Sequence, residues 1–170
     1  MIYKSLLAGA MMMAAVPAVA QSGGSTSTQA MTGAQFVEVA TISNLFEIQS
    51  SQAALEKAQT EEVKAFAQQM IDDHTKAAND MKAAVAKAGG DMKMPTALDA
   101  EHQKILDDLN AETGDDFDEE YVDAQVDAHE KAVALFTTYS KSGDQPALKD
   151  FATKTLPVLQ KHYDHIQKMD

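Results

Sequence analysis

Apolar residues recur at spacings of three and four along most of the chain, which is the period of helices with one buried face. The first such segment runs from Thr32 to about Ala58, and Gln35 stands where a capping box with Thr32 would place it. The second begins after the N-cap residue Thr60 and ends at the pair Gly89-Gly90. Their predicted buried stripes are Phe36, Ala40, Ser43, Glu47, Ser50 and Ala54, and then Val63, Ala67, Met70, His74, Ala77, Met81 and Ala84.

Three further helices are expected after a loop at residues 91–95. The shorter of them starts at Thr96 and covers about 96–113. The next starts from an acidic cap, Asp116 or Asp118, and ends at Gly143, and the last begins with Pro146, which suits a first helical turn. Their inward positions are Leu98, His102, Ile105 and Leu109, then Val122, Gln125, His129, Ala132 and Phe136, and finally Leu148, Phe151, Thr155, Leu159, His162, Ile166 and Met169.

These elements predict an all-α fold, a ferritin-like four-helix bundle with a short extra crossover helix. No stretch of the sequence alternates as a strand would. A short helix of about 17 residues would span roughly 26 Å at about 1.5 Å per residue. That length is enough to carry the chain back along the bundle, so the second and fourth helices should run in the same direction.

The first residues have the features of a secretory signal peptide, assigned to 1–20. A basic start at Lys4 precedes an apolar run, and Ala18-Val19-Ala20 is a small-x-small cleavage signal. The run is shorter than the roughly 20 residues that span a bilayer, although a retained anchor is the alternative. Residues 21–31 are expected to be a disordered linker and 32–170 the bundle domain, in a protein that is periplasmic or secreted.

The mature chain would be strongly acidic, because the whole sequence already has a formal net charge of −12. This charge argues against nucleic acid and anionic lipid as partners, and it favours solubility. The chain has no cysteine, which excludes disulfides and thiolate metal sites.

Four ionisable residues occupy the otherwise apolar stripes: Glu47, His74, His129 and His162. Each lies near the middle of a different long helix, where an unpaired polar group costs roughly 2 kcal/mol or more. Three neutral imidazoles and a carboxylate suit a divalent first-row metal, namely zinc, copper, iron, manganese or nickel. The alternative is a metal-free hydrogen-bond network among the same residues, Tyr121 and water.

Whether the four residues meet depends on the crossover. With the crossover path, we expect the first and last connections to lie at one end of the bundle. The four residues would then lie about 11, 14, 14 and 16 residues from that end, a spread of roughly 7 Å. Side-chain reach can absorb such a difference. If the short helix lay flat instead, His162 would fall well below the others.

Other polar residues are weaker candidates. Asp73 and Glu130 neighbour two of the histidines in sequence but point about 100° away, so each is either a surface residue or a hydrogen-bond partner from an adjacent helix. His102 is expected to be structural and His165 to lie at the surface edge. Two loop methionines and an acidic run remain: Met92 and Met94, which would suit Cu(I), and residues 115–120, which lack the spacing of a calcium loop.

Three stretches of the chain resemble a known family: FAQQMIDDHT at 66–75, GDDFDEEYVDAQVDAHEKAV at 114–133 and LKDFATKTLPVLQKHYDH at 148–165. The order of their DH, FD..Y…H and LP.L..H elements is similar to that of the bacterial exported domain-of-unknown-function family 4142. The resemblance implies a ferritin-like four-helix domain and carries over Glu47, His74, His129 and His162 as motif positions. It implies no established activity. A Glu-x-x-His pair on two helices, which di-iron proteins use, is missing, so a single-metal site fits better.

The sequence therefore predicts an exported helical-bundle protein that binds a single transition metal in its core and serves in metal handling or envelope stress protection. Whether such a site also catalyses a redox or hydrolytic reaction stays open. The alternative, from another class, is a metal-free envelope interaction or structural module with a buried His/Glu network. pH sensing is a third hypothesis, since histidines titrate near neutrality.

Overall fold

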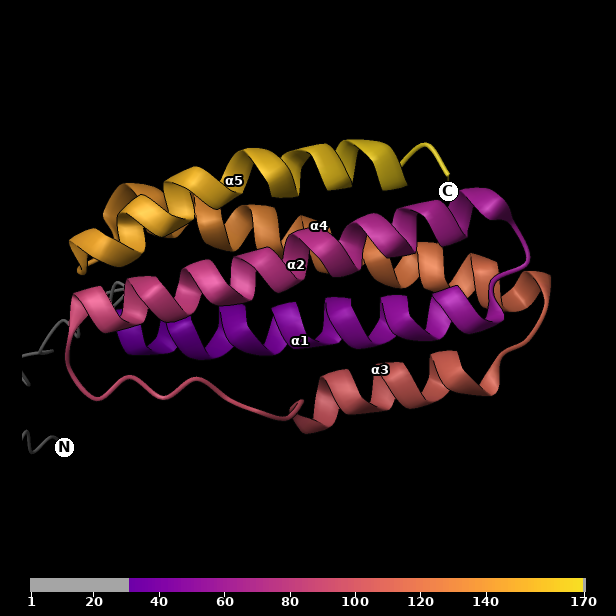
Figure 1. The fold of residues 1–170 in the computed structure, drawn as a ribbon, viewed down its shortest axis with the longest axis horizontal. Coiled ribbons are helices and arrows are strands. Elements are labelled where there is room, and N and C mark those ends of the chain that lie inside the picture. The colour runs from indigo at the N-terminus through magenta and orange to yellow at the C-terminus, as the bar shows by residue number, and fades with distance from the viewer. Residues whose placement is uncertain (1–30, 170) are drawn as a thin grey trace, which may run out of the picture.

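Five α-helices make up the part of the chain, residues 31–169, that the computed structural model describes (Figure 1). The helices are α1 (Gly33–Lys57), α2 (Glu61–Ala88), α3 (Ala100–Ala111), α4 (Asp115–Ser142) and α5 (Pro146–Ile166). No strand occurs within this range. The predicted all-α bundle is confirmed.

Two antiparallel pairs form the bundle, α1 with α2 and α4 with α5, and they pack side by side (Figure 1). The chain passes from the first pair to the second along the non-helical residues 89–99, here called the strap, and then along α3. This path makes α2 and α4 run in the same direction, as predicted (Figure 1). It also puts the α4–α5 connection at the opposite end of the bundle from the α1–α2 turn, so the expectation that both lie at one end was wrong.

Helix starts follow local capping chemistry, with two corrections. Thr32 and Gln35 form the predicted capping box, and Thr60 caps α2. The third helix begins later than predicted, because Asp99 rather than Thr96 accepts from the backbone of its first turn. No side chain caps α4, which starts at Asp115 after Gly114 with a φ of 67°.

Asp118 has a different role from the predicted one. Its carboxylate accepts from the backbone N–H groups of Gln59 and Thr60, at 2.9 Å each, and from the Thr60 hydroxyl. These bonds hold the α1–α2 turn against the first turn of α4. They satisfy backbone donors at a helix start that would otherwise lack partners.

The core is divided by a polar layer at mid-height of the bundle. The buried polar residues of this layer are Glu47, Ser50, His74, Gln125, His129 and His162. On one side lies the strap-side core, which includes Phe36, Met81, Phe136, Phe151 and Leu159. On the other lies the turn-side core, which includes Phe66, Met70, Leu109, Phe117, Tyr121 and Ile166. The layer is where the bundle's chemistry is concentrated.

Residues 1–30 lie outside the described part of the chain, so the predicted signal peptide and nearly all of the predicted linker lie there too. Met31, the last linker residue, is half-buried against the strap-side core. Among the described helices, none is long and apolar enough to cross a membrane.

Candidate metal centre

The four predicted residues reach one depth because each lies a similar distance from its helix terminus at the strap end. Glu47 is 14 residues from Gly33 and His74 is 14 residues from Ala88. His129 is 13 residues from Ser142 and His162 is 16 residues from Pro146. At about 1.5 Å per residue the spread is roughly 4.5 Å. The convergence holds, although the end from which it is counted differs from the predicted one.

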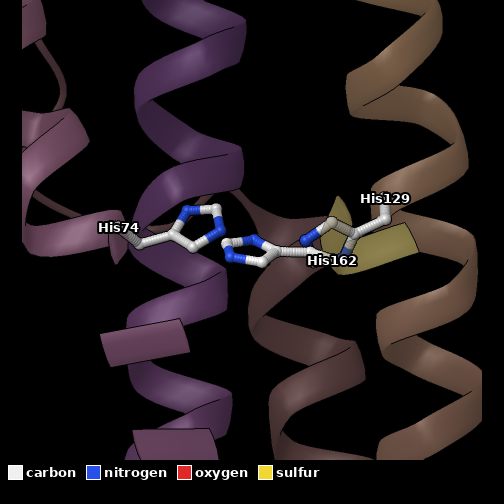
Figure 2. A group of neighbouring side chains, drawn as sticks. All are labelled: His74, His129 and His162. Atoms are coloured by element: carbon white, nitrogen blue, oxygen red, sulfur yellow. The ribbon is translucent and has the colours of Figure 1, made fainter. Parts of the chain in front are cut away.

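Three of the four residues form a tight cluster. One ring nitrogen each of His74, His129 and His162 lies within 4.8 Å of the others, and all three side chains are buried. The ring centroids are 5.5 to 5.8 Å apart. Figure 2 shows the three imidazoles extending toward one another from three helices. Two ligands at 2.0–2.1 Å on a tetrahedral metal are about 3.4 Å apart, so small side-chain movements would bring the nitrogens to a common ion.

Each imidazole is held by one ring nitrogen. His74 Nδ1 bonds Asn44 Oδ1 at 3.0 Å, and His129 Nδ1 bonds the Gln125 carbonyl oxygen at 2.9 Å. His162 Nε2 bonds Asp73 Oδ2 at 2.9 Å. All three partners are oxygens, so each held nitrogen carries the proton and donates. This is how metal-binding histidines are oriented in known sites.

The other nitrogen of each ring has no partner. His74 Nε2, His129 Nε2 and His162 Nδ1 are buried without a hydrogen bond. Because the held nitrogen has the proton, each free nitrogen presents a lone pair. A hydrogen-bond network explains the held nitrogens but leaves three buried acceptors unsatisfied, which native interiors normally avoid. The arrangement is that of an acceptor cluster for a cation.

The burial of the cluster keeps the imidazoles neutral. The pKa of His129 is lowered to about 4, mainly by desolvation; the Gln125 carbonyl opposes this shift, and the nearby His162 adds to it. Desolvation also lowers the pKa of His74, and the neighbouring His129 and His162 add to this. For His162, desolvation lowers the pKa while Asp73 opposes the shift. Neutral imidazole is the form that binds metals.

Glu47 lies beside the cluster rather than within the group of three. Its Oε1 is 3.6 Å from His129 Nδ1, the nitrogen already bonded to the Gln125 carbonyl. Burial raises the pKa of Glu47 from 4.5 to about 8, against the effect of the Gln125 side chain. Gln125 in turn donates to Ser50 Oγ at 3.0 Å. At neutral pH this carboxyl is largely protonated as long as no cation is near.

Most of the hydrogen-bond partners of the three histidines were not predicted from the sequence. Asp73 was expected at the surface, with a bond to a neighbouring helix as the alternative, and the structure shows that alternative. Asn44 and Gln125 were not proposed as partners. Their signal was present, because Gln125 stands one turn before His129 in the same stripe and Asn44 three residues before Glu47.

The weaker candidates remain apart from the cluster. His102 bonds Asp99 and packs edge-on against Phe46, while His165 is exposed on α5. Glu130 is exposed. Met92 and Met94 are half-buried in the strap and pack against the strap-side core.

Comparison with family profiles gives one match over nearly the whole chain. The family described as "Domain of unknown function (DUF4142)" matches residues 18–169. A search of curated proteins found no match.

Solved structures with similar folds include a DUF305 fragment from Deinococcus radiodurans and CopM. The DUF305 fragment is 14% identical, with a TM-score of 0.68, and the match covers 80% of this chain and 93% of that one. CopM in its Cu(I)-bound form is 19% identical, with a TM-score of 0.66, covering 82% of this chain and 95% of that one. In its Cu(II)-bound form the TM-score is 0.68 at the same identity, covering 82% and 96%. At these identities the likeness concerns the fold.

Proposed function

We propose that this chain, which belongs to the domain-of-unknown-function family DUF4142, binds a single transition-metal ion through His74, His129 and His162. The observation that carries the proposal is the set of three buried lone pairs, each on a ring whose other nitrogen is fixed by an oxygen acceptor. A cation would satisfy all three at once. Within residues 31–169, no other group hydrogen-bonds these three nitrogens.

Glu47 is proposed to serve the same ion. Three neutral imidazoles bring no negative charge, and a divalent ion in an apolar core needs compensation. A cation at the cluster would favour loss of the Glu47 proton, because an opposite charge nearby stabilises the ionised form. Glu47 would then either ligate the ion by a rotamer change or act through His129, whose ring it already faces.

Copper is the first metal to test, followed by zinc. Imidazole suits both metals, and CopM, which shares the fold, has been solved with Cu(I) and with Cu(II). If the predicted signal peptide directs export, the protein would act outside the cytoplasm, where a buried single-ion site would serve metal handling or protection from envelope stress.

The test is the metal content of tag-free protein, because a polyhistidine tag would itself bind these ions. Wild type incubated with Cu(I) under reducing conditions, or with Zn(II), and then desalted should retain one ion per chain by mass spectrometry. His129→Ala should lose that ion. His165→Ala is the matched control, since His165 is exposed on α5 one turn from His162 and lies outside the cluster.

A second readout is thermal unfolding. Free ion at 100 times its Kd would stabilise the folded wild type by about 2.7 kcal/mol, and the melting temperature of His129→Ala should not respond. Equal ion retention by wild type and His129→Ala would overturn the proposal and leave the interaction module as the better hypothesis.

A further inference from the structure

A cavity of about 460 Å³ opens beside the metal centre in the strap-side half of the bundle. Lys82 of α2 and Thr96 of the strap are the exposed residues of its lining, so we take them to mark its mouth. Its inner wall is made by Phe136 of α4 and Phe151 of α5. Cavities of 300–1,000 Å³ are typical of sites for small organic ligands.

The cavity reaches the histidine cluster. His74 and its partner Asn44 both belong to the wall. The free nitrogen of His74 is one of the three proposed ligand atoms. A molecule in the cavity would therefore lie next to the proposed ion.

The lining is mostly apolar and includes one buried hydroxyl without a partner. Thr41 is 8% exposed, and its Oγ1 has no hydrogen bond. Helical threonines often bond a carbonyl one turn back, which the Thr41 hydroxyl does not do. The Thr41 Oγ1 atom is itself closed off from the cavity space, so it would reach a bound molecule by rotation about χ1, since threonines in helices adopt two rotamers. An unsatisfied hydroxyl behind an apolar wall costs free energy, and a bound molecule with one polar atom would remove that cost.

The charged residues of the cavity wall indicate which class of molecule the cavity could bind. Although the chain has 26 acidic residues, the cavity wall contains none, and its one charged residue is Lys82 at the mouth. The interior thus has no counter-ion for a cationic ligand and none for a buried anion. Alanines at 40, 77, 78 and 132 leave the space that a flat or branched apolar group would fill.

We propose that this cavity binds a neutral, largely apolar organic molecule bearing one hydroxyl or carbonyl group. A rotation about χ1 of Thr41 lets its Oγ1 exchange a hydrogen bond with that group, and the apolar part packs against Phe136 and Phe151. The polar group then faces His74 and the ion, a placement that rests on the proposed function, whereas the binding itself needs no ion.

The first experiment uses metal-free protein and two fluorescent probes, 2-naphthol and naphthalene, which differ by one hydroxyl. Wild type should bind 2-naphthol saturably and more tightly than naphthalene. Thr41→Val keeps the side-chain shape and should weaken 2-naphthol by about five- to tenfold, the value of one hydrogen bond, with naphthalene unchanged. Ala132→Leu, which fills the space, should weaken both probes. Thr138→Val, the same change at an exposed position of α4, should alter neither.

Three results would overturn the proposal: no saturable binding of either probe, equal loss of both in Thr41→Val, or tighter binding of 2-naphthalenesulfonate that Lys82→Met abolishes. The last result would assign the site to anions.

The second experiment uses Co(II)-loaded protein, because Co(II) reports ligand changes in its visible spectrum and does not oxidise the probe. 2-Naphthol should shift that spectrum in wild type and less in Thr41→Val. Binding without a shift would overturn the placement beside the ion. If the chain retains no ion at all, the proposed function fails, while the metal-free experiment still decides whether the cavity binds its ligand.

Discussion

The two halves of the core, on either side of the polar layer, are built differently. The turn-side core is filled by large, fully buried side chains, among them Phe66, Phe117 and Tyr121. The strap-side core contains the cavity, and the helices that face it contribute several alanines there. One bundle can therefore combine a densely packed half with a half that contains open space. The polar layer lies where these two halves meet.

Truncating a large side chain should show the difference between the two halves most clearly in the free energy of unfolding. Phe66→Ala in the turn-side core should cost about 3–5 kcal/mol of unfolding free energy, because a dense site cannot collapse around the void. Phe136→Ala should cost about 1–2 kcal/mol less, since Phe136 already has the cavity on one side and loses fewer contacts. Urea unfolding of both variants measures the difference, and equal losses would contradict the comparison.

The pH dependence of the metal-free protein tests the layer between the halves. Burial raises the pKa of Glu47 from 4.5 to about 8, so the folded chain keeps a proton that the unfolded chain releases, and stability falls as pH rises through this window. Burial lowers the pKa of His129 from 6.5 to about 4, so below pH 6.5 the unfolded chain binds the extra proton and stability rises with pH. His74 and His162 are shifted in the same direction as His129.

Stability should therefore peak near pH 6.5 and fall by about 2 kcal/mol toward pH 8. Denaturant titrations from pH 5 to 8 measure this profile. Glu47→Gln should remove the fall above pH 6.5 and keep the rise below it. A fall that persists in Glu47→Gln would assign it to another group.

Replacing a buried alanine with leucine should have the smallest effect on the free energy of unfolding. The turn-side core should tolerate the added side chain poorly, whereas the strap-side core should tolerate it well. Ala67→Leu in the turn-side core, where Ala67 is fully buried, should cost about 1–3 kcal/mol through overpacking. Ala132→Leu at the cavity wall should change the unfolding free energy by less than about 1 kcal/mol, because space exists for the added carbons. Melting temperatures of the two variants, compared with wild type, check the contrast.

Much of the fold could be predicted because the spacing of apolar residues and the capping residues of each helix are local features of the sequence. The stripes around Glu47, His74, His129 and His162 are buried as expected, except for four members that are only half-buried, Ser43, Ala77, Thr155 and Met169. The three histidines could be predicted to lie close together because the helical rise per residue gives the height of each residue along the bundle from its distance to the helix end. Glu47 as a ligand stays a prediction.

The rest depends on contacts between elements, which no local pattern contains. Asp118 was assigned to its own helix because acidic residues commonly cap, whereas its partners Gln59 and Thr60 belong to a turn nearly sixty positions earlier. The bond from Asp73 to His162 depends on how α2 and α5 are rotated against each other. The cavity was missed because periodicity marks Ala77 and Ala132 as apolar without measuring the volume that they leave empty.

His74 comes from the α1–α2 pair, while His129 and His162 come from the α4–α5 pair. An ion held by all three would act as a cross-link between two hairpins that the backbone joins only through residues 89–114. A chain cut in the strap would leave neither fragment with the full set of imidazoles. Uptake of the ion would then require association of the two fragments, and the bound ion would add to the apolar contacts that join them.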